Sequence, residues 1–164
     1  MKKLIYVEEN FISPSECQEL IDISKSNKEE IPYGDKSRGG NTYLTTLDGI
    51  YFDSKENNVV DKVTNLCKTF DDRVLIDYAA VVRWPEGTFM KPHIDPSRPG
   101  QEPDLMAAVL YLNDDFAGGC TRFDDYEIKP ETGKLLVFSN SIYKHHVSKI
   151  EGAERFALSI WYNQ

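Results

Sequence analysis

Three histidines and one aspartate are the residues whose types and spacing could hold a metal ion. His93 and Asp95 sit one residue apart, and the other two histidines, His145 and His146, are adjacent near the C-terminus. On an extended segment, the side chains of residues i and i+2 point to the same side. Two imidazoles and a carboxylate suit a divalent transition metal and leave coordination positions open. His-x-Asp alone is a weak signal with a turn or capping pair as the alternative, so the metal hypothesis needs one of the distant histidines.

The last apolar segment, RFALSIWY at 155–162, combines an apolar face with a face that contains a cation. Side chains along a strand alternate between two faces. One face consists of Phe156, Leu158, Ile160 and Tyr162, and the other of Arg155, Ala157, Ser159 and Trp161. The first, apolar face would pack on helices or on a second sheet. An arginine beside small residues on an inward face leaves room for an anionic ligand. A surface salt bridge at a hairpin is the alternative role for Arg155.

The spacing of apolar residues predicts the elements that must position these side chains. Two N-terminal segments, 13–27 and 57–72, have helical spacing, and the first follows an extended stretch. Short apolar runs bounded by turn residues follow at 74–84, 104–113, 119–123, 134–140, 145–150 and 155–162. Such a series predicts an antiparallel sandwich or barrel.

We therefore expect a mainly β (α+β) fold, a double-stranded β-helix or jelly roll with N-terminal helices packed on one sheet. The chain of 164 residues fits one domain, 1–164, with a helical N-terminal part at about 1–72 and a jelly-roll core at about 73–164. The glycine-rich segment 34–49 is expected to be a mobile loop or a hairpin.

Composition and charge exclude several classes of function. The net charge of −8 argues against a nucleic-acid partner, which needs clustered cations. The first apolar stretch, LIYV, is too short for a signal peptide or a membrane span, so we expect no membrane partner and a cytoplasmic location. Cys17, Cys67 and Cys120 are odd in number and widely spaced, which predicts reduced thiols in or near the core.

Four segments, taken in order, resemble the Fe(II)- and 2-oxoglutarate-dependent dioxygenases, and within them most closely the prolyl 4-hydroxylase branch. The segments lie between about residues 78 and 162 and read RWPEGTFMKPHID, AAVLYLNDDFAGGCTRF, GKLLVFSNSIYKHHV and GAERFALSIWY. The resemblance implies that His93, Asp95 and His145 hold Fe(II) as a facial triad. HHV sits where the family commonly has His-x-Val, and His146 replaces His145 if the strand alternation slips.

The resemblance also assigns a cosubstrate pocket. Arg155 resembles the basic residue that pairs with the far carboxylate of 2-oxoglutarate, a task that suits the planar fork of a guanidinium. Tyr111 matches a tyrosine whose hydroxyl reaches the same carboxylate, although a core tyrosine is the alternative. Thr121 would flank the cosubstrate, and Ser159 would line the same cavity.

Three further residues are candidates for contact with substrate. Trp161 could face the target residue. Trp84 stands where prolyl hydroxylases usually carry a tyrosine, so an indole N–H replaces a phenol. Arg38 lies in the glycine-rich segment, which could close over substrate as a lid, with an exposed hairpin tip as the alternative.

The resemblance implies an enzyme that uses Fe(II), O2 and 2-oxoglutarate, with ascorbate as a reductant, to hydroxylate a prolyl residue in a peptide or protein. Succinate and CO2 would be released. Two alternatives stay open: the same chemistry on another amino-acid side chain or small metabolite, and a non-catalytic jelly-roll binding module. A zinc hydrolase is disfavoured because the sequence has no helical H-E-x-x-H.

Overall fold

The computed structural model describes residues 3–47, 59–95 and 105–163, and these residues form two helices, a 3-10 turn and a series of strands. The elements of the N-terminal half are β1 (Ile5–Glu8), α1 (Pro14–Ser26), β2 (Ile31–Asp35), the 3-10 turn η1 (Lys36–Arg38), β3 (Gly40–Thr46), α2 (Val59–Phe70), β4 (Leu75–Trp84) and β5 (Met90–His93). Those of the C-terminal half are β6 (Met106–Tyr111), β7 (Ala117–Gly118), β8 (Thr121–Arg122), β9 (Glu127–Ile128), β10 (Leu135–Phe138), β11 (His145–Val147), β12 (Ile150–Glu151) and β13 (Arg155–Asn163).

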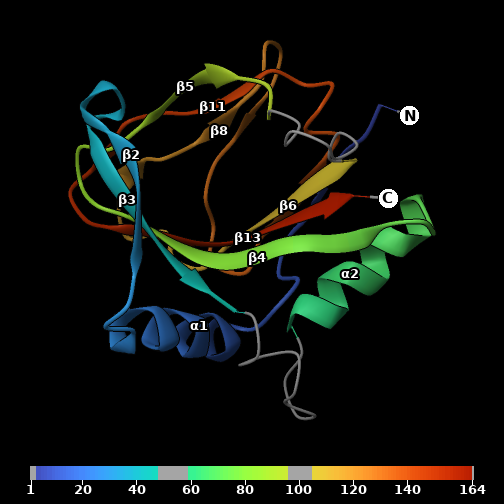
Figure 1. Ribbon diagram of the computed structural model, residues 1–164, viewed down its shortest axis with the longest axis horizontal. Coiled ribbons are helices and arrows are strands. Elements are labelled where there is room, and N and C mark those ends of the chain that lie inside the picture. The colour runs from blue at the N-terminus through green and yellow to red at the C-terminus, as the bar shows by residue number, and fades with distance from the viewer. Residues whose placement is uncertain (1–2, 48–58, 96–104, 164) are drawn as a thin grey trace.

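Two antiparallel sheets face each other. The larger has seven strands in the order β1-β10-β6-β13-β4-β3-β2, the smaller has the order β5-β11-β8-β9, and β12 pairs with β7 in a short ribbon. Helices α1 and α2 lie on the face of the larger sheet that points away from the smaller one (Figure 1). This arrangement confirms the expected double-stranded β-helix with helices on one sheet.

Helix α1 begins where the sequence places its capping residues. The Ser13 side chain accepts a hydrogen bond from the Glu16 backbone, the Glu16 side chain accepts one from the Ser13 backbone, and Pro14 occupies the first turn. One side of the helix, which includes Cys17, Leu20 and Ile21, is buried in the core between helices and sheet. The helix is therefore fixed at its start by the cap and along its length by the apolar stripe.

Strand β13 runs through the centre of the larger sheet between β4 and β6. Its apolar face lies in the helix-side core and consists of Phe156, Leu158, Ile160 and Tyr162. The opposite face, which begins with Arg155, therefore points toward the smaller sheet. The alternation expected for this segment is confirmed, and it directs the single cation of the strand into the space between the sheets.

The N-terminal part supplies three strands as well as the helices. Strand β1 pairs with β10, and the hairpin β2–β3 extends the larger sheet beyond β4. The segment 34–49 is thus a hairpin as far as residue 47, and residues 48–49 lie outside the described residues. Strand β2 is exposed along its whole length, Ile31 and Tyr33 included, and Pro32 and Gly34 lie within it, so its short sequence gives no clear strand signal.

All three cysteines are free thiols and buried, as expected. Burial raises the pKa of the Cys17 thiol to about 11 and that of the Cys67 thiol to about 12. Within residues 3–47, 59–95 and 105–163, neither helix has the length and apolarity that a membrane span requires.

Candidate metal centre and anion pocket

His93, Asp95 and His145 converge between the two sheets. Strands β5 and β11 pair so that His93 and His145 lie directly opposite each other, with ring centroids 4.4 Å apart. Asp95 follows β5 at an i+2 position, and its Oδ1 lies 3.1 Å from His93 Nε2 and 3.5 Å from His145 Nε2. One ligand atom from each residue lies within 4.8 Å of the others, which could place all three around one metal ion.

The hydrogen bonds of both imidazoles leave Nε2 free to bind a cation. Nδ1 of His93 lies 2.8 Å from the carbonyl oxygen of Lys91, and Nδ1 of His145 lies 3.0 Å from that of Tyr143. A carbonyl oxygen can only accept, so in each neutral ring Nδ1 carries the proton and Nε2 carries the lone pair. Metal-binding histidines are commonly oriented in this way.

Asp95 is held through its other oxygen. Oδ2 accepts hydrogen bonds from Nδ2 of Asn140 at 2.9 Å and from Nε1 of Trp161 at 3.2 Å. Burial, the largest single influence, raises the pKa of Asp95, but the nearby His145 and His93 rings and the hydrogen bond from Asn140 together hold that pKa well below its ordinary value. The carboxylate is therefore ionised at neutral pH and presents Oδ1 toward the two histidines.

The structure distinguishes between the two adjacent histidines. His145 is buried, and its ring contacts Phe138 edge-on with centroids 4.7 Å apart. His146 lies outside the cluster that could hold a metal ion and is paired with Arg122 of β8 in the strand register. His145 is thus the C-terminal histidine that joins His93 and Asp95.

Arg155 is buried between the sheets, and no counter-ion contacts it among the described residues. Its side chain stacks on two aromatic rings, with Cζ 5.0 Å from the centroid of Trp84 and 5.3 Å from that of Tyr111. Only 2% of the residue is exposed, and among the described residues no carboxylate forms an ion pair with it. Burial lowers the pKa of the guanidinium from its ordinary value. A buried cation without a partner is costly, which indicates a site for an anion.

Polar groups near Arg155 add to this candidate anion site. The Tyr111 hydroxyl lies 2.6 Å from the Thr121 hydroxyl, and both residues are buried. Ser159 is half-buried on the face of β13 that carries Arg155. Nε1 of Trp84 and Nε of Arg155 are buried and have no hydrogen-bond partner among the described residues. These unsatisfied donors fit a carboxylate ligand, because a buried donor without an acceptor costs free energy.

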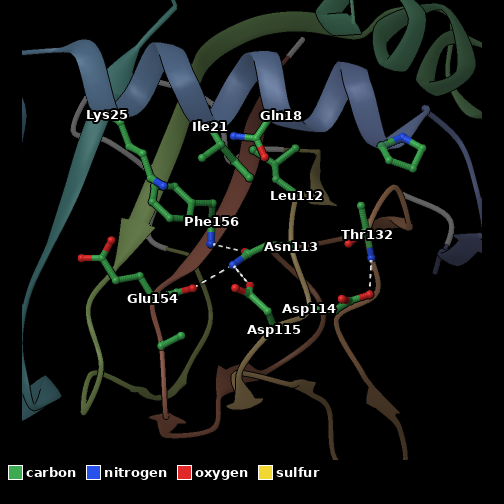
Figure 2. A pocket seen from close by; sticks show the side chains of 12 residues that line it. Gln18, Ile21, Lys25, Leu112, Asn113, Asp114, Asp115, Thr132, Glu154 and Phe156 are labelled. Carbon is green, nitrogen blue, oxygen red and sulfur yellow. Dashed lines mark hydrogen bonds between the residues drawn. The ribbon is translucent and has the colours of Figure 1, made fainter.

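Two residues that the sequence did not single out shape the pocket. Gly119 has a φ of +63°, and a Cβ there would lie 2.9 Å from Cδ of Arg155, so only glycine leaves room for that side chain. The Asn113 side chain donates to the carbonyl oxygen of Glu154 and accepts from the backbone N–H of Phe156, both at 2.8 Å (Figure 2). Asn113 thus holds the two residues that flank Arg155. In the sequence, only the position of Asn113 within the segment AAVLYLNDDFAGGCTRF could have suggested this role.

A separate cavity of about 460 Å³ lies between α1 and the turns that precede β13 (Figure 2). Its lining contains none of the predicted site residues. Lys25 reaches over the Phe156 ring there, and the remaining polar groups mostly hydrogen-bond to one another or to the nearby backbone. We assign no ligand to this cavity.

The candidate substrate residues lie in different surroundings. Trp84 is 6% exposed and stacks with Arg155. Trp161 is half-buried and reaches Asp95. Arg38 is in η1, at the tip of the β2–β3 hairpin, and its carbonyl oxygen accepts a hydrogen bond from the N–H of Phe89, just before β5.

The donor set of both sites fits the groups that the sequence resemblance implies. Two neutral imidazoles and one carboxylate with positions left open suit Fe(II). A buried guanidinium that has no ion pair within the described part of the chain suits the far carboxylate of a keto acid such as 2-oxoglutarate.

Comparisons with known proteins agree with this geometry. The family model described as the 2OG-Fe(II) oxygenase superfamily matches residues 79–163. No curated protein matches the sequence.

Solved structures share the fold at low sequence identity. A Pseudomonas putida prolyl-4-hydroxylase has a TM-score of 0.74 at 19% identity, covering 98% of this chain and 92% of its own. The viral collagen prolyl hydroxylase of Paramecium Bursaria Chlorella virus-1, in complex with 2OG, has a TM-score of 0.70 at 20% identity, covering 96% and 94%. A Trichoplax adhaerens prolyl hydroxylase in complex with a hypoxia inducible factor peptide fragment has a TM-score of 0.70 at 18% identity, covering 96% and 82%.

Proposed function

Because this chain belongs to the 2OG-Fe(II) oxygenase superfamily, we propose that it hydroxylates a prolyl residue in a peptide or protein. The observation that carries the proposal is the convergence of His93, Asp95 and His145 in the same fold that buries Arg155, which has no ion pair among the described residues. When bound, Fe(II) with 2-oxoglutarate and O2 supplies the oxidising power for hydroxylation and releases succinate and CO2, with ascorbate as a reductant.

The residues of the chain have separate tasks in this proposal. His93, Asp95 and His145 would hold Fe(II) through Nε2, Oδ1 and Nε2 and would leave coordination positions for other ligands. Arg155 and the Tyr111 hydroxyl bind the far carboxylate of 2-oxoglutarate at the other end of the pocket. Two anchors fix both ends of the cosubstrate, so that it meets the metal in one orientation.

The walls of the pocket complete the cosubstrate site. Thr121 is hydrogen-bonded to Tyr111 and orients its hydroxyl. Ser159 faces the same space from β13. The indole N–H of Trp84 has no acceptor among the described residues, so we assign it to the cosubstrate as well. Burial of Thr121 and Trp84 keeps water away from this end of the pocket.

The substrate side opens toward the β2–β3 hairpin. The His93 side chain is 27% exposed, and the Arg38 guanidinium stacks on the Tyr33 ring at 5.2 Å. The pKa of His93 is raised chiefly by the Asp95 carboxylate, and the Arg38 charge acts in the opposite direction. We assign Arg38 to the mouth of the site, where it favours a peptide with an acidic residue next to the target.

Prolyl specificity draws support from the relatives. The three structures reported above are prolyl hydroxylases, and one of them contains a bound peptide. Trp84 favours a second candidate, hydroxylation of another amino-acid side chain or a small metabolite. It is an indole where prolyl hydroxylases usually carry a tyrosine, and it lies against the cosubstrate arginine.

A turnover assay tests the proposal. Proline-containing peptides are incubated with the protein, Fe(II), 2-oxoglutarate and ascorbate, and succinate and peptide mass are measured. We expect succinate release together with a mass increase of one oxygen atom on a proline-containing fragment, both lost in Asp95→Ala. Oxygen incorporation at another residue favours the second candidate, and no iron-dependent turnover with a filled metal site contradicts both.

A further inference from the structure

Two neutral side chains converge on the oxygen of Asp95 that does not face the histidines. Asn140 Nδ2 and Trp161 Nε1 donate to Oδ2 at 2.9 and 3.2 Å, whereas Oδ1 faces both imidazoles. The backbone N–H of Asp95 also donates to the carbonyl oxygen of Asn140 at 3.4 Å. Asp95 is therefore fixed at its backbone and at one carboxylate oxygen by residues remote in sequence.

A pairing irregularity in the neighbouring strand β4 lies beside Trp161: Trp161 pairs with Tyr78 and Tyr162 with Ile76, so the extra residue is on β4, whereas β13 pairs regularly with β6. Such bulges are frequent beside functional sites. The Tyr78 ring lies 5.8 Å from the indole between centroids, and its hydroxyl lies 2.7 Å from that of Thr46 on β3. The Tyr78 ring therefore packs next to the indole.

We propose that Trp161 and Asn140 are positioning residues that keep Asp95 a one-oxygen ligand of the metal. With Oδ2 engaged by two donors, only Oδ1 can bind the ion. If Oδ2 were free, the carboxylate could bind through both oxygens and occupy a position that the cosubstrate or O2 needs. The proposal rests on the metal site of the proposed function, and it is independent of which substrate is hydroxylated.

The structure provides variants that remove one donor at a time. Trp161→Phe removes the N–H and keeps an aromatic ring. Asn140→Ala removes the side-chain donor but keeps the backbone carbonyl that binds Asp95, and Asn140 Oδ1 has no partner among the described residues, so no other side-chain hydrogen bond is lost. Tyr78→Phe is the matched control, because it loses a hydroxyl on the same wall without touching Asp95.

The experiment is an anaerobic titration of the apo protein with Fe(II), and with Co(II) as a spectroscopic probe. We expect Trp161→Phe and Asn140→Ala each to weaken metal binding about tenfold, and the double variant to bind more weakly than either. The visible absorption of bound Co(II) should change in these variants, because it depends on the number of ligands. Tyr78→Phe should bind the metal with an affinity within about twofold of wild type. It does not remove a hydrogen bond to the metal-ligating Asp95, and loss of such a bond is what weakens metal binding.

The thermal unfolding of the apo proteins separates a local effect from a folding defect. Trp161→Phe is expected to unfold close to the wild-type temperature, since the apolar contact remains. Wild-type metal affinity and an unchanged Co(II) spectrum in Trp161→Phe and in Asn140→Ala overturn the inference while leaving the proposed function intact. Failure of the wild-type protein to bind either metal overturns the metal site of the proposed function itself.

Discussion

Arg155→Met separates stability from cosubstrate binding more sharply than any other single change. The arginine is buried and has no ion pair among the described residues, so the protein without cosubstrate carries the cost of an uncompensated charge. Methionine has a similar length, is apolar and adapts to irregular space. We therefore expect the variant to be more stable than the wild type in the absence of 2-oxoglutarate, and unable to bind it.

The expected magnitude follows from the contacts of the guanidinium. Removing an unpaired buried charge relieves several kcal/mol, whereas losing the stacking on Trp84 and Tyr111 costs about 0.5–2 kcal/mol for each ring. The net gain is about 1–2 kcal/mol, which raises the melting temperature by roughly 2–8 °C for a domain of this size. Loss of the guanidinium that pairs with the far carboxylate of 2-oxoglutarate should weaken the binding of 2-oxoglutarate by about 2–5 kcal/mol.

Thermal unfolding with and without cosubstrate measures both effects. In the wild type with Mn(II), 2-oxoglutarate at about one hundred times its Kd should add about 2.7 kcal/mol, or roughly 5–10 °C. In Arg155→Met this increment should vanish while the baseline melting temperature rises. A variant that is less stable than the wild type and still stabilised by 2-oxoglutarate would refute the argument that Arg155 awaits an anion.

Three further predictions concern other parts of the molecule. Gly119→Ala should weaken 2-oxoglutarate binding at least tenfold, as measured by calorimetry, because the added Cβ displaces Arg155. Gly152→Ala is the control: Gly152 also has a positive φ, but a Cβ there meets no atom within 4 Å, so the affinity should stay within about twofold of wild type. Arg38→Gln should reduce kcat/KM about threefold or more for peptides with an acidic residue beside the target proline, because a charge at the rim of a site attracts the opposite charge. The kcat/KM of basic peptides should not change. Equal effects on both kinds of peptide would contradict the placement of Arg38 at the mouth of the site. Burial raises the pKa of the Cys67 thiol from 9.0 to about 12, so its contribution to stability is complete below pH 9 and falls as the pH rises toward 12. Urea unfolding should show this alkaline loss, reduced in Cys67→Ala; an identical pH profile in that variant would assign the loss to other groups.

Local sequence patterns predict the strand content of the chain and the direction in which the side chain of Arg155 points from the last strand. Alternation in 155–162 predicted which side chains of β13 face the helices and which face the smaller sheet, because period-two alternation is a property of each strand by itself. The same reasoning failed for β2, which is exposed along its whole length and contains Pro32 and Gly34, residues that are uncommon inside strands. Edge strands that bury neither face are therefore the elements that a single sequence conceals.

The sequence left two histidines as alternatives, and long-range register decides between them. His145 joins His93 and Asp95 because β11 pairs with β5 so that the two histidines lie opposite each other. Register between strands that are remote along the chain depends on packing of the whole sheet, which no local pattern reports.

The residues that orient the site were also beyond prediction. Asn140, Asn113 and Gly119 act through a hydrogen bond to a carboxylate, hydrogen bonds to backbone groups and the absence of a side chain. Asparagine and glycine are common in turns for local reasons, so their types do not reveal such roles. Trp161 was expected to face substrate, and the structure adds its hydrogen bond to Asp95.

The measurement that tests the central claim most directly is an anaerobic titration of the apo protein with Fe(II) and 2-oxoglutarate, followed by visible absorption. A metal held by His93, Asp95 and His145 and chelated by the keto acid should give a charge-transfer band that requires both components. We expect this band in the wild type, and its absence in Asp95→Ala. A wild-type protein that gives no band at saturating Fe(II) and 2-oxoglutarate would contradict the joint metal and cosubstrate site.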